Sequence, residues 1–503
     1  MPTPQEIELK LLVLLPSADE ALRQLRRAPA LRRRRVKTHD LLNRYFDTPD
    51  LALHRLRCAL RLRQTDGQGW KQTLKTAGTS QGGLSQRGEW ESPVPTGRLD
   101  PTALQDTAWD TLDPDGRLWH QLAPCFETRC RRSTWQVRTR DGSHIEVAFD
   151  AGEVVAGNAH AHWLELELEL LQGPAERLFD LADQLATHLA LLPSDISKAE
   201  RGYALANGTL HVPQKARPVA LVRKAAPLML AVPVLAEIQG QLQRNLEGLR
   251  HSNDPELVHQ ARVAWRRWRS VHRLLRPWLP VPPPPADGLR LVLDDLGPLR
   301  DLDVALTDTL PAWQAAYTQG NPEAVAVRER HWHEAVQALQ CAADALRHRV
   351  RGAMVQPALG QYLIASTRWL HALATPPNDA DQEASKNPTP SSRWATDRLK
   401  RWHREVRRLL HRAERHPQRL HDARLLAKRL RYASEAIQTT LPKSQLRRNA
   451  RWTRRAQLWQ ESLGRERDLD QAVALLQQHG AAEPLVAFMR GARTALQTTP
   501  TPR

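Results

Sequence analysis

Charged side chains alternate with apolar ones along several short segments within the first 172 residues. The charged and polar members are Glu6, Glu8 and Lys10; Arg61 and Arg63; Lys71, Thr73 and Lys75; Glu146 and Asp150; and Glu165, Glu167 and Glu169. Because side chains on a strand point alternately to opposite faces, these segments predict strands with one charged and one apolar face. Carboxylates on such a face could hold hard divalent cations, and arginine and lysine could hold a row of phosphates.

For any single strand, an ordinary sheet with one solvated face explains this alternation. The segment 165–169 argues against that explanation, because its three glutamates share one face. Like charges on one strand face repel, and a purely structural strand gains nothing from gathering them. If the sheet closes on itself, acidic and basic strands meet across a lumen. The residues therefore favour a site for phosphate and metal inside a closed barrel.

The order of these residues resembles the CYTH domain, the family of triphosphate tunnel metalloenzymes. The resemblance rests on Glu6-Ile7-Glu8-Leu9-Lys10, Tyr45-Phe46-Asp47-Thr48-Pro49, Leu60-Arg61-Leu62-Arg63, Leu74-Lys75, Arg132-Ser133, Asp150, the Glu-x-Glu strand at 165–169 and Ser197-Lys198. One short charged motif would be weak, but the whole set in order within one domain's length is specific. The resemblance covers residues 1–205. It implies an eight-stranded antiparallel β-tunnel that hydrolyses a triphosphate with Mg²⁺ or Mn²⁺.

The same resemblance implies roles for individual residues. The metal-binding set is Glu6, Glu8, Asp150, Glu165 and Glu167. The phosphate-binding set is Lys10, Arg61, Arg63, Lys75, Arg132 and Lys198, and the catalytic residues are Glu6, Glu8, Lys10 and Lys75. Three positions stay open: Glu169 extends the acidic face or lies at the mouth, and Glu146 could replace Asp150. Arg87, followed by Glu89 and Glu91, belongs to the site or to a rim salt bridge, and we expect the rim. No protein nucleophile is needed, because phosphoryl transfer depends on positioning and charge neutralisation.

The whole chain must position these residues and carry a large positive charge. It has 503 residues, 41% of them hydrophobic, and 73 Lys+Arg against 55 Asp+Glu give a formal net charge of +18. Such a surplus implies a polyanionic partner, which could be nucleic acid, polyphosphate or an anionic membrane. We expect no membrane span, because no uncharged run approaches the necessary length, and no signal peptide, because the first residues lack a basic segment followed by an apolar one. Four cysteines without metal-site spacing fit a reducing compartment. We expect a cytoplasmic protein.

Composition and periodicity predict an α+β multidomain chain. The predicted parts are residues 1–205, with β texture; 206–226, a linker; 227–375, a first helical bundle; 376–392, a flexible loop rich in Pro, Asp and Ser; and 393–495, a second bundle. The helical half contains an internal repeat. His259-x2-Arg262-x3-Arg266-Arg267-x-Arg269 matches His421-x2-Arg424-x3-Lys428-Arg429-x-Arg431, and each copy is followed by Leu-Gly-x2-Arg-Asp-Leu-Asp. Matched landmarks at similar spacing indicate two copies of one unit.

The cations of each copy share one helix face. In the first copy they are His259, Arg262, Arg266, Arg269 and Arg273, and a further stripe that includes Arg404 and Arg408 precedes the second copy. A charge run is usually a solvated face, but solvated faces mix signs, and these have almost no acid. Like charges at this spacing cost about 0.2–0.5 kcal/mol per pair. A bound anion that compensates them is expected, and the evenly spaced phosphates of a flexible polymer would fit.

This half resembles the CHAD domain over residues 225–495. The resemblance implies two four-helix bundles around a basic cavity that binds inorganic polyphosphate. The polyphosphate-binding residues are then His259, Arg262, Arg266, Arg269, Arg404, Arg408, His421, Arg424, Lys428 and Arg431. The expected function is hydrolysis of inorganic triphosphate, coupled to polyphosphate binding. The alternatives are an enzyme for an organic triphosphate (a thiamine triphosphatase, or a cyclase acting on ATP) and a non-catalytic binder of polyphosphate or nucleic acid, of which nucleic acid is less favoured.

Overall fold

The structure is a computed structural model that describes residues 5–219, 221, 227–374, 391–413, 418–440 and 443–498. The chain divides into two compact units. The tunnel unit comprises Met1–Val212, Pro283–Leu289 and Met354–His371. The helical unit comprises Pro213–Pro282, Arg290–Ala353 and Ala372–Arg503. The predicted loop at 376–392 lies outside the described residues, except for the last two positions.

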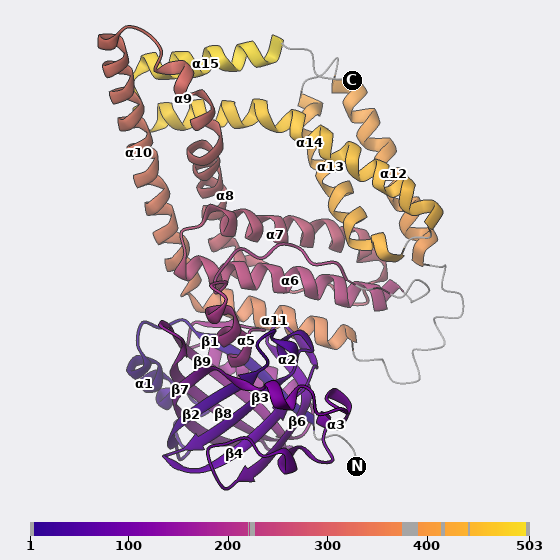
Figure 1. Ribbon diagram of the computed structural model, residues 1–503. Helices are drawn as coiled ribbons and strands as arrows, with labels where there is room; N and C mark the ends of the chain where they lie inside the picture. Colours follow the sequence, from indigo (N-terminus) through magenta and orange to yellow (C-terminus); the bar gives the residue numbers. More distant parts are fainter. Residues whose placement is uncertain are drawn as a thin grey trace. The chain divides into compact units, whose positions relative to one another are not determined.

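The strands of the tunnel unit form one antiparallel sheet. They are β1 (Gln5–Val13), β2 (Lys37–Asp47), β3 (Ala59–Thr65), β4 (Gln68–Lys75), β5 (Thr79–Gln81), β6 (Leu84–Val94), β7 (Ala123–Arg138), β8 (His144–Ala156), β9 (Ala159–Gln172) and β10 (Leu191–Pro193). Their order is β10-β1-β9-β8-β7-β2-β3-β4-β6-β5, and β1 also pairs with β6. That pairing closes a ring of eight strands, whose ribbons are labelled in Figure 1. Strand β5 pairs in addition with β6, and β10 with β1. The predicted antiparallel tunnel is confirmed.

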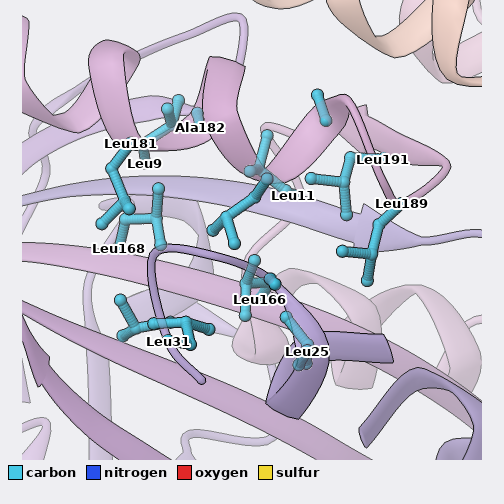
Figure 2. Close-up of a cluster of buried hydrophobic side chains, with 14 of the residues drawn as sticks. Leu9, Leu11, Leu25, Leu31, Leu166, Leu168, Leu181, Ala182, Leu189 and Leu191 are labelled. Atoms are coloured by element: carbon cyan, nitrogen blue, oxygen red, sulfur yellow. The ribbon is translucent and has the colours of Figure 1, made fainter. Parts of the chain in front are cut away.

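The apolar faces of the ring strands pack outward. Helices α1 (Ala18–Arg27) and α4 (Glu176–Ala186) contribute to a buried cluster that contains Leu9 and Leu11 of β1 and Leu166 and Leu168 of β9 (Figure 2). Each fully buried leucine side chain contributes about 1.5–3 kcal/mol to this core. Because neighbouring residues on a strand point the other way, this packing turns the charged residues of β1 and β9 into the ring.

Short helices flank the strands of the ring: α2 (Ala52–Arg55), α3 (Trp109–Leu112) and α5 (Lys198–Ala206). Helix α5 begins with a capping box, in which Ser197 and Glu200 each accept a hydrogen bond from the other's backbone N–H. The hydroxyl of Tyr203 in α5 donates to the buried carboxylate of Asp47, at 2.7 Å. These bonds fix the first turn of α5, which carries Lys198.

Helix α11 (Pro357–Ala374) falls within the residues predicted for the first bundle, yet most of it belongs to the tunnel unit. Ile364 of α11 is fully buried in the same cluster as Leu9 and Leu11. Arg368 pairs with Asp180 and Asp183 of α4, the latter at 3.1 Å. The compact tunnel unit is therefore assembled from separate parts of the sequence.

The remaining long helices contribute to the helical unit. They are α6 (Pro227–His251), α7 (Pro255–Leu275), α8 (Asp287–Val304), α9 (Pro311–Tyr317), α10 (Pro322–Met354), α12 (Ser391–Ala413), α13 (Gln418–Ile437), α14 (Lys443–Gln478) and α15 (Glu483–Thr498). The repeated His-x2-Arg motifs lie on α7 and α13, and the repeated Leu-Gly pairs lie on α8 and α14. The helical character of this half is confirmed. Among the described residues, no helix has the length and apolar character needed to cross a membrane.

The two repeated helices each bury a stripe of apolar residues. On α7 they are Ala261, Ala264, Trp268, Val271 and Leu275, and on α13 they are Ala423, Leu426, Leu430, Ala433 and Ile437. Arg267 is buried as well, and it pairs with Glu237 of α6 at 2.8 Å. The apolar stripes hold the helices together, so the cationic face of each repeat is left for another role.

Candidate functional site

The register of neighbouring strands brings the charged faces of β1 and β9 together. Glu8 pairs with Glu169 and Lys10 with Glu167 in the β1–β9 ladder. The next ladder places Asp150 of β8 opposite Glu165. Alternation along each strand and pairing between strands therefore concentrate acids and bases inside the ring.

A cavity of about 440 Å³ occupies the ring. The predicted residues that line it are Glu6, Glu8, Lys10, Arg61, Arg63, Lys75, Arg132, Glu167 and Lys198. Asp150 and Glu165, which the resemblance placed in the metal set, are fully buried and do not line this cavity. The structure thus brings most of the predicted set around one space and places two carboxylates behind its wall.

The two hidden carboxylates are held by buried cations. The Nζ atom of Lys198 lies 2.9 Å from Asp150, 2.5 Å from Glu165 and 2.7 Å from Glu167. Arg132 donates to both oxygens of Asp150, at 2.7 and 2.6 Å. Burial opposes ionisation of Asp150, but the charges of Arg132 and Lys198 outweigh it and hold its pKa below the ordinary value. For Glu165 burial wins, and its pKa is raised.

A second ion-pair cluster surrounds the start of β1. Glu8 lies 2.7 Å from Lys10 and 2.7 Å from Arg87, and Glu6 lies 2.9 Å from Lys75. Burial acts to raise the pKa of Glu8, but these cations overcome it and lower that pKa. Arg87 was expected at the rim, yet it pairs with both glutamates of the opening motif and lines the cavity. Its place follows from the β1–β6 register, which sets Arg87 beside Glu6.

The cavity contains three arginines, Arg61, Arg63 and Arg132, and not all of them are paired with a carboxylate of the described residues. Arg63 donates through Nε to the amide oxygen of Asn43, at 2.9 Å. Among the described residues, no carboxylate lies within ion-pair distance of Arg63. Burial and the charges of Arg61 and Arg132 lower the pKa of Arg63 to about 10. The buried Nε of Arg61 also has no hydrogen-bond partner in the described part of the chain. An anion that entered the cavity would relieve this repulsion.

The opposite imbalance is found at Glu169. Burial and the charges of Glu6, Glu8 and Glu146 raise the pKa of Glu169 to about 7. In the part of the chain that the structure describes, no cationic side chain lies within ion-pair distance of this carboxylate. The sequence left open whether Glu169 extends the acidic face or lies at the mouth. It lines the cavity beside the acids of β1.

These carboxylates suit a divalent cation. Oxygen ligands of Asp150, Glu165 and Glu167 lie within 4.8 Å of one another, and Oε2 of Glu165 is buried without a partner among the described residues. The second acidic group consists of Glu169 with Glu6 and Glu8. Hard cations such as Mg²⁺ and Mn²⁺ take carboxylate oxygens. The donor set therefore fits the implied metal, although Lys198 competes for the first group.

Two further residues line the cavity: Glu89, which the sequence left open, and His54, which it missed. Glu89 lies 2.9 Å from Lys75. Burial raises the pKa of Glu89, but the charges of Lys75 and Arg61 outweigh burial and lower that pKa to about 2. His54 also lines the cavity, and its ring stacks on Tyr203 at 4.3 Å between centroids. The alternation of Arg87, Glu89 and Glu91 was the signal for β6. Nothing in the local pattern around His54 marked it, because α2 meets α5 only in the folded chain.

A different arrangement of charge occurs in the helical unit, where α7 packs against α13. Arg262 and Arg266 of α7, Arg424 and Lys428 of α13 and Arg467 of α14 form a group that we call the basic cluster. Burial and the charges of other members lower the pKa of Lys428 to about 7, and burial with the charges of Arg266, Arg467 and Arg300 lowers that of Arg262 to about 10. Asp301 and Asp468 are acids that act on the cluster. Within the described residues, none of the five cations forms an ion pair.

The other predicted polyphosphate-binding residues lie around this cluster or apart from it. Burial and the charge of Arg300 lower the pKa of His259, on which Arg431 also acts. Arg269 is exposed, and its charge acts on Arg429. Arg404 and Arg408 are exposed on α12, and Arg408 pairs with Glu405 at 3.3 Å. The side chain of His421 lies outside the described residues.

Comparisons with known proteins fit both halves of the chain. A family model of the CYTH domain matches residues 4–203, and a model of the CHAD domain matches residues 234–477. An inorganic triphosphatase of Haemophilus influenzae is 36% identical over 202 residues, which make up 40% of this chain and 55% of that protein. The chain therefore spans about half the length of this curated relative.

Two solved structures are also similar. A CHAD domain from the plant Ricinus communis is 27% identical, covers 58% of this chain and 93% of its own, and gives a TM-score of 0.46. A proposed adenylyl cyclase from Hippeastrum, which reveals a dominant triphosphatase activity, is 23% identical, covers 40% of this chain and 95% of its own, and gives a TM-score of 0.29.

Proposed function

The chain carries a CYTH domain followed by a CHAD domain, and from that premise we propose that its tunnel hydrolyses inorganic triphosphate to pyrophosphate and phosphate. The curated relative from Haemophilus influenzae is named an inorganic triphosphatase, which supports this reaction. The observation that carries the proposal is the cavity, where, among the residues that the structure describes, Arg63 has no carboxylate and Glu169 no cation within ion-pair distance. A polyanion that enters together with a divalent cation would satisfy both.

The residues of the chain supply binding and alignment. Arg61, Arg63 and Arg132 would take the phosphate oxygens, with the forked guanidinium geometry that suits them. Lys10 and Lys75 would neutralise the rest of the chain of phosphates from the β1 side. A divalent cation held by Glu6, Glu8, Glu169 and Glu167 would supply Lewis-acid polarisation and a more acidic bound water. Asp150 and Glu165 would hold Lys198 in place from behind the wall.

The lining favours an inorganic substrate over ATP or thiamine triphosphate. Tyr45 and Tyr203 border the cavity, but both are buried and packed. His54 is already stacked on Tyr203. A nucleobase or thiamine ring gains affinity by stacking on an available aromatic face, and these faces are engaged. A panel of triphosphate, ATP and thiamine triphosphate would separate the substrates.

Phosphate release from triphosphate tests the proposal. We expect turnover with Mg²⁺ or Mn²⁺, none in excess EDTA, and a loss of roughly 10²-fold or more in Glu8→Gln, because one of the carboxylates proposed to hold the cation is removed. Glu153→Gln is the matched control, since Glu153 on β8 is partly exposed, pairs with His160 and does not line the cavity. Full activity in EDTA would contradict the metal requirement, and full activity of Glu8→Gln would contradict the site.

We also propose that the helical unit binds inorganic polyphosphate. The support is the basic cluster, whose cations repel one another and have no carboxylate partner within ion-pair distance among the described residues. A flexible polymer of phosphates could contact several of them at once. Competition of long-chain polyphosphate against single-stranded RNA, at matched phosphate concentration and salt, tests this preference. Tighter binding of RNA would favour a nucleic-acid binder instead.

We infer a cytoplasmic location for the protein. Cys58, Cys125, Cys130 and Cys341 are free thiols, and Cys341 is exposed. Exposed thiols are typical of a reducing compartment.

A further inference from the structure

Helix α11 belongs to the tunnel unit, although it lies far beyond the residues that match the CYTH domain. Only Val355 and Gln356 separate it from α10 of the helical unit. Helix α11 contacts β10, the turn at Gly82 and helix α4, and Ile364 shares a buried cluster with the apolar face of β1. These contacts lie on the side of β1 opposite to its charged residues.

The first contact is a close approach of two backbones. A Cβ atom built on Gly360 would lie 2.1 Å from the carbonyl oxygen of Leu191 in β10. No side chain fits there, so α11 rests directly on β10. Strand β10 pairs with β1 through Leu11, Leu12 and Val13. The position of α11 is therefore fixed against the end of the strand that carries Glu8 and Lys10.

The second contact reaches the backbone of Lys10 through a turn. The buried hydroxyl of Thr367 lies 3.0 Å from the carbonyl oxygen of Gly82 and 3.0 Å from that of Leu363, and it can donate to either. The next residue, Gly83, accepts a hydrogen bond from the N–H of Lys10 at 2.9 Å. Gly83 has a positive φ of 92°, and a Cβ there would lie 2.6 Å from the carbonyl oxygen of Lys10.

The same turn is fastened from its other side. The N–H of Gly83 donates to the carboxylate of Asp195 at 2.8 Å, and the hydroxyl of Ser80 donates to that carboxylate at 3.0 Å. The carbonyl oxygen of Lys10 accepts from the N–H of Ser194 at 3.1 Å. Both backbone groups of Lys10 thus depend on loops outside the ring, and α11 packs on one of these loops.

We propose that α11 is a positioning element of the tunnel, in which Gly360 and Thr367 hold the turn and strand that place Lys10 and Glu8. Neither residue touches the cavity. The proposal rests on the proposed triphosphatase function, and it makes substrate binding in the tunnel depend on a segment from the helical half of the sequence. A displacement of about 1 Å at a binding group can cost 10²-fold in rate, so a small shift of α11 is enough.

Two pairs of variants in the full chain test the proposal. Gly360→Ala forces a Cβ against the Leu191 carbonyl, whereas Gly352→Ala in α10 is a matched control, because a Cβ at Gly352 meets nothing within 4 Å. Alanine has the higher helix propensity, by up to about 1 kcal/mol, at both sites. Thr367→Val removes the hydroxyl at nearly constant shape, and Thr367→Ser retains it.

The readout is the split between KM and kcat for triphosphate. We expect Gly360→Ala to raise KM by about tenfold and Thr367→Val by about threefold, since a displaced Lys10 binds phosphate less well. Gly352→Ala and Thr367→Ser should keep the KM of the unaltered chain. A purely structural role would lower the folded fraction, and hence the apparent kcat, with KM unchanged. A KM within twofold of the unaltered chain in both Gly360→Ala and Thr367→Val would overturn the proposal.

Failure of the proposed function gives a different pattern. If the unaltered chain does not hydrolyse triphosphate, the same variants are compared by calorimetric binding of triphosphate without metal. Weaker binding in Gly360→Ala and Thr367→Val, but not in their controls, would support α11 as a positioning element even then. Equal binding in all five proteins would overturn it.

Discussion

The tunnel and the basic cluster both gather cations, but they balance them differently. In the tunnel, most bases contact an acid: Lys198 contacts three carboxylates, and Arg87 contacts Glu6 and Glu8. In the basic cluster, the charges of Arg266, Arg424 and Arg467 repel the charge of Lys428, and burial disfavours that charge further. The tunnel thus holds charge that is already neutralised and fixed in place. The cluster holds charge that no carboxylate of the described residues neutralises through an ion pair.

This difference implies two kinds of recognition. A cavity whose charges are mostly paired gives an incoming anion little net electrostatic attraction. The anion must therefore bind together with a cation and fit the arrangement of the basic side chains. An unbalanced cluster attracts any long polyanion, and its affinity falls as salt rises because counterions are released on binding. Such a division suits an enzyme that is selective for a short substrate and a tether that tolerates many chain lengths.

The sharpest test of this contrast removes the cation at the centre of the tunnel. Lys198→Met would leave Asp150, Glu165 and Glu167 as buried carboxylates without their shared partner. Breaking a buried ion pair in this way costs about 3–5 kcal/mol, and triphosphate hydrolysis should be lost. The free energy of unfolding in urea, followed by the β-sheet signal in circular dichroism, measures the loss.

A second substitution separates charge from packing. Because burial raises the pKa of Glu165 and so disfavours its charge, Glu165→Gln alone should cost less stability than Lys198→Met. In the double variant with Lys198→Met, it should recover part of the lost stability by removing one uncompensated charge. If Lys198→Met unfolds at the same urea concentration as the unaltered chain, the tunnel is not held together by these pairs.

The matching change in the basic cluster should have the opposite effect on stability. Burial and the charges of Arg266, Arg424 and Arg467 lower the pKa of Lys428 from 10.5 to about 7. The unfolded chain binds the proton more tightly, so this lysine makes the free energy of unfolding rise as pH increases from about 7 to 10.5. Lys428→Met should remove that rise, keep or increase stability at pH 6, and weaken polyphosphate binding.

Polyphosphate binding as a function of salt completes this test. Loss of one phosphate contact should reduce the slope of log affinity against log salt by about one. Lys400→Met on α12 is a matched control, because Lys400 is partly exposed and pairs with Asp397 at 3.0 Å. If Lys428→Met lowered stability as much as Lys198→Met does, the two regions would not differ in the way described.

The sequence predicted which residues face the tunnel better than it predicted which of them touch. Period-two alternation decides the face of a strand, and the charged faces of β1 and β9 point into the ring as expected. The pairing between strands depends on register, which is set by contacts between distant segments. That is why the sequence could not show that Lys198 covers Asp150 and Glu165, or that Arg87 reaches Glu6 and Glu8.

Helix α11 shows a second limit of the sequence. Its apolar face has the same period as those of the bundle helices around it, so the pattern assigned residues 357–374 to the first bundle. Periodicity shows that a helix buries one of its faces, but it does not show which element covers that face. The signals that distinguish α11 are Gly360 and Thr367, whose meaning depends on the nearby backbones of β10 and the turn at Gly82.

The smallest effect that separates the two regions is in the pH dependence of cation binding by the tunnel. Burial and the charges of Glu6, Glu8 and Glu146 raise the pKa of Glu169 from 4.5 to about 7. The folded chain therefore keeps a proton that the unfolded chain releases, and the free energy of unfolding falls as pH rises through that window. A cation must displace this proton, so the Mn²⁺ concentration for half-maximal activity should fall about tenfold from pH 6 to pH 8, most of it below pH 7, and level off above pH 8. Glu169→Gln should weaken Mn²⁺ binding and flatten this dependence, while polyphosphate binding by the basic cluster keeps its own pH profile. A pH dependence that persists unchanged in Glu169→Gln would assign the proton to another carboxylate of the cavity. Glu169 would then not be the acidic counterpart of Arg63 in the tunnel.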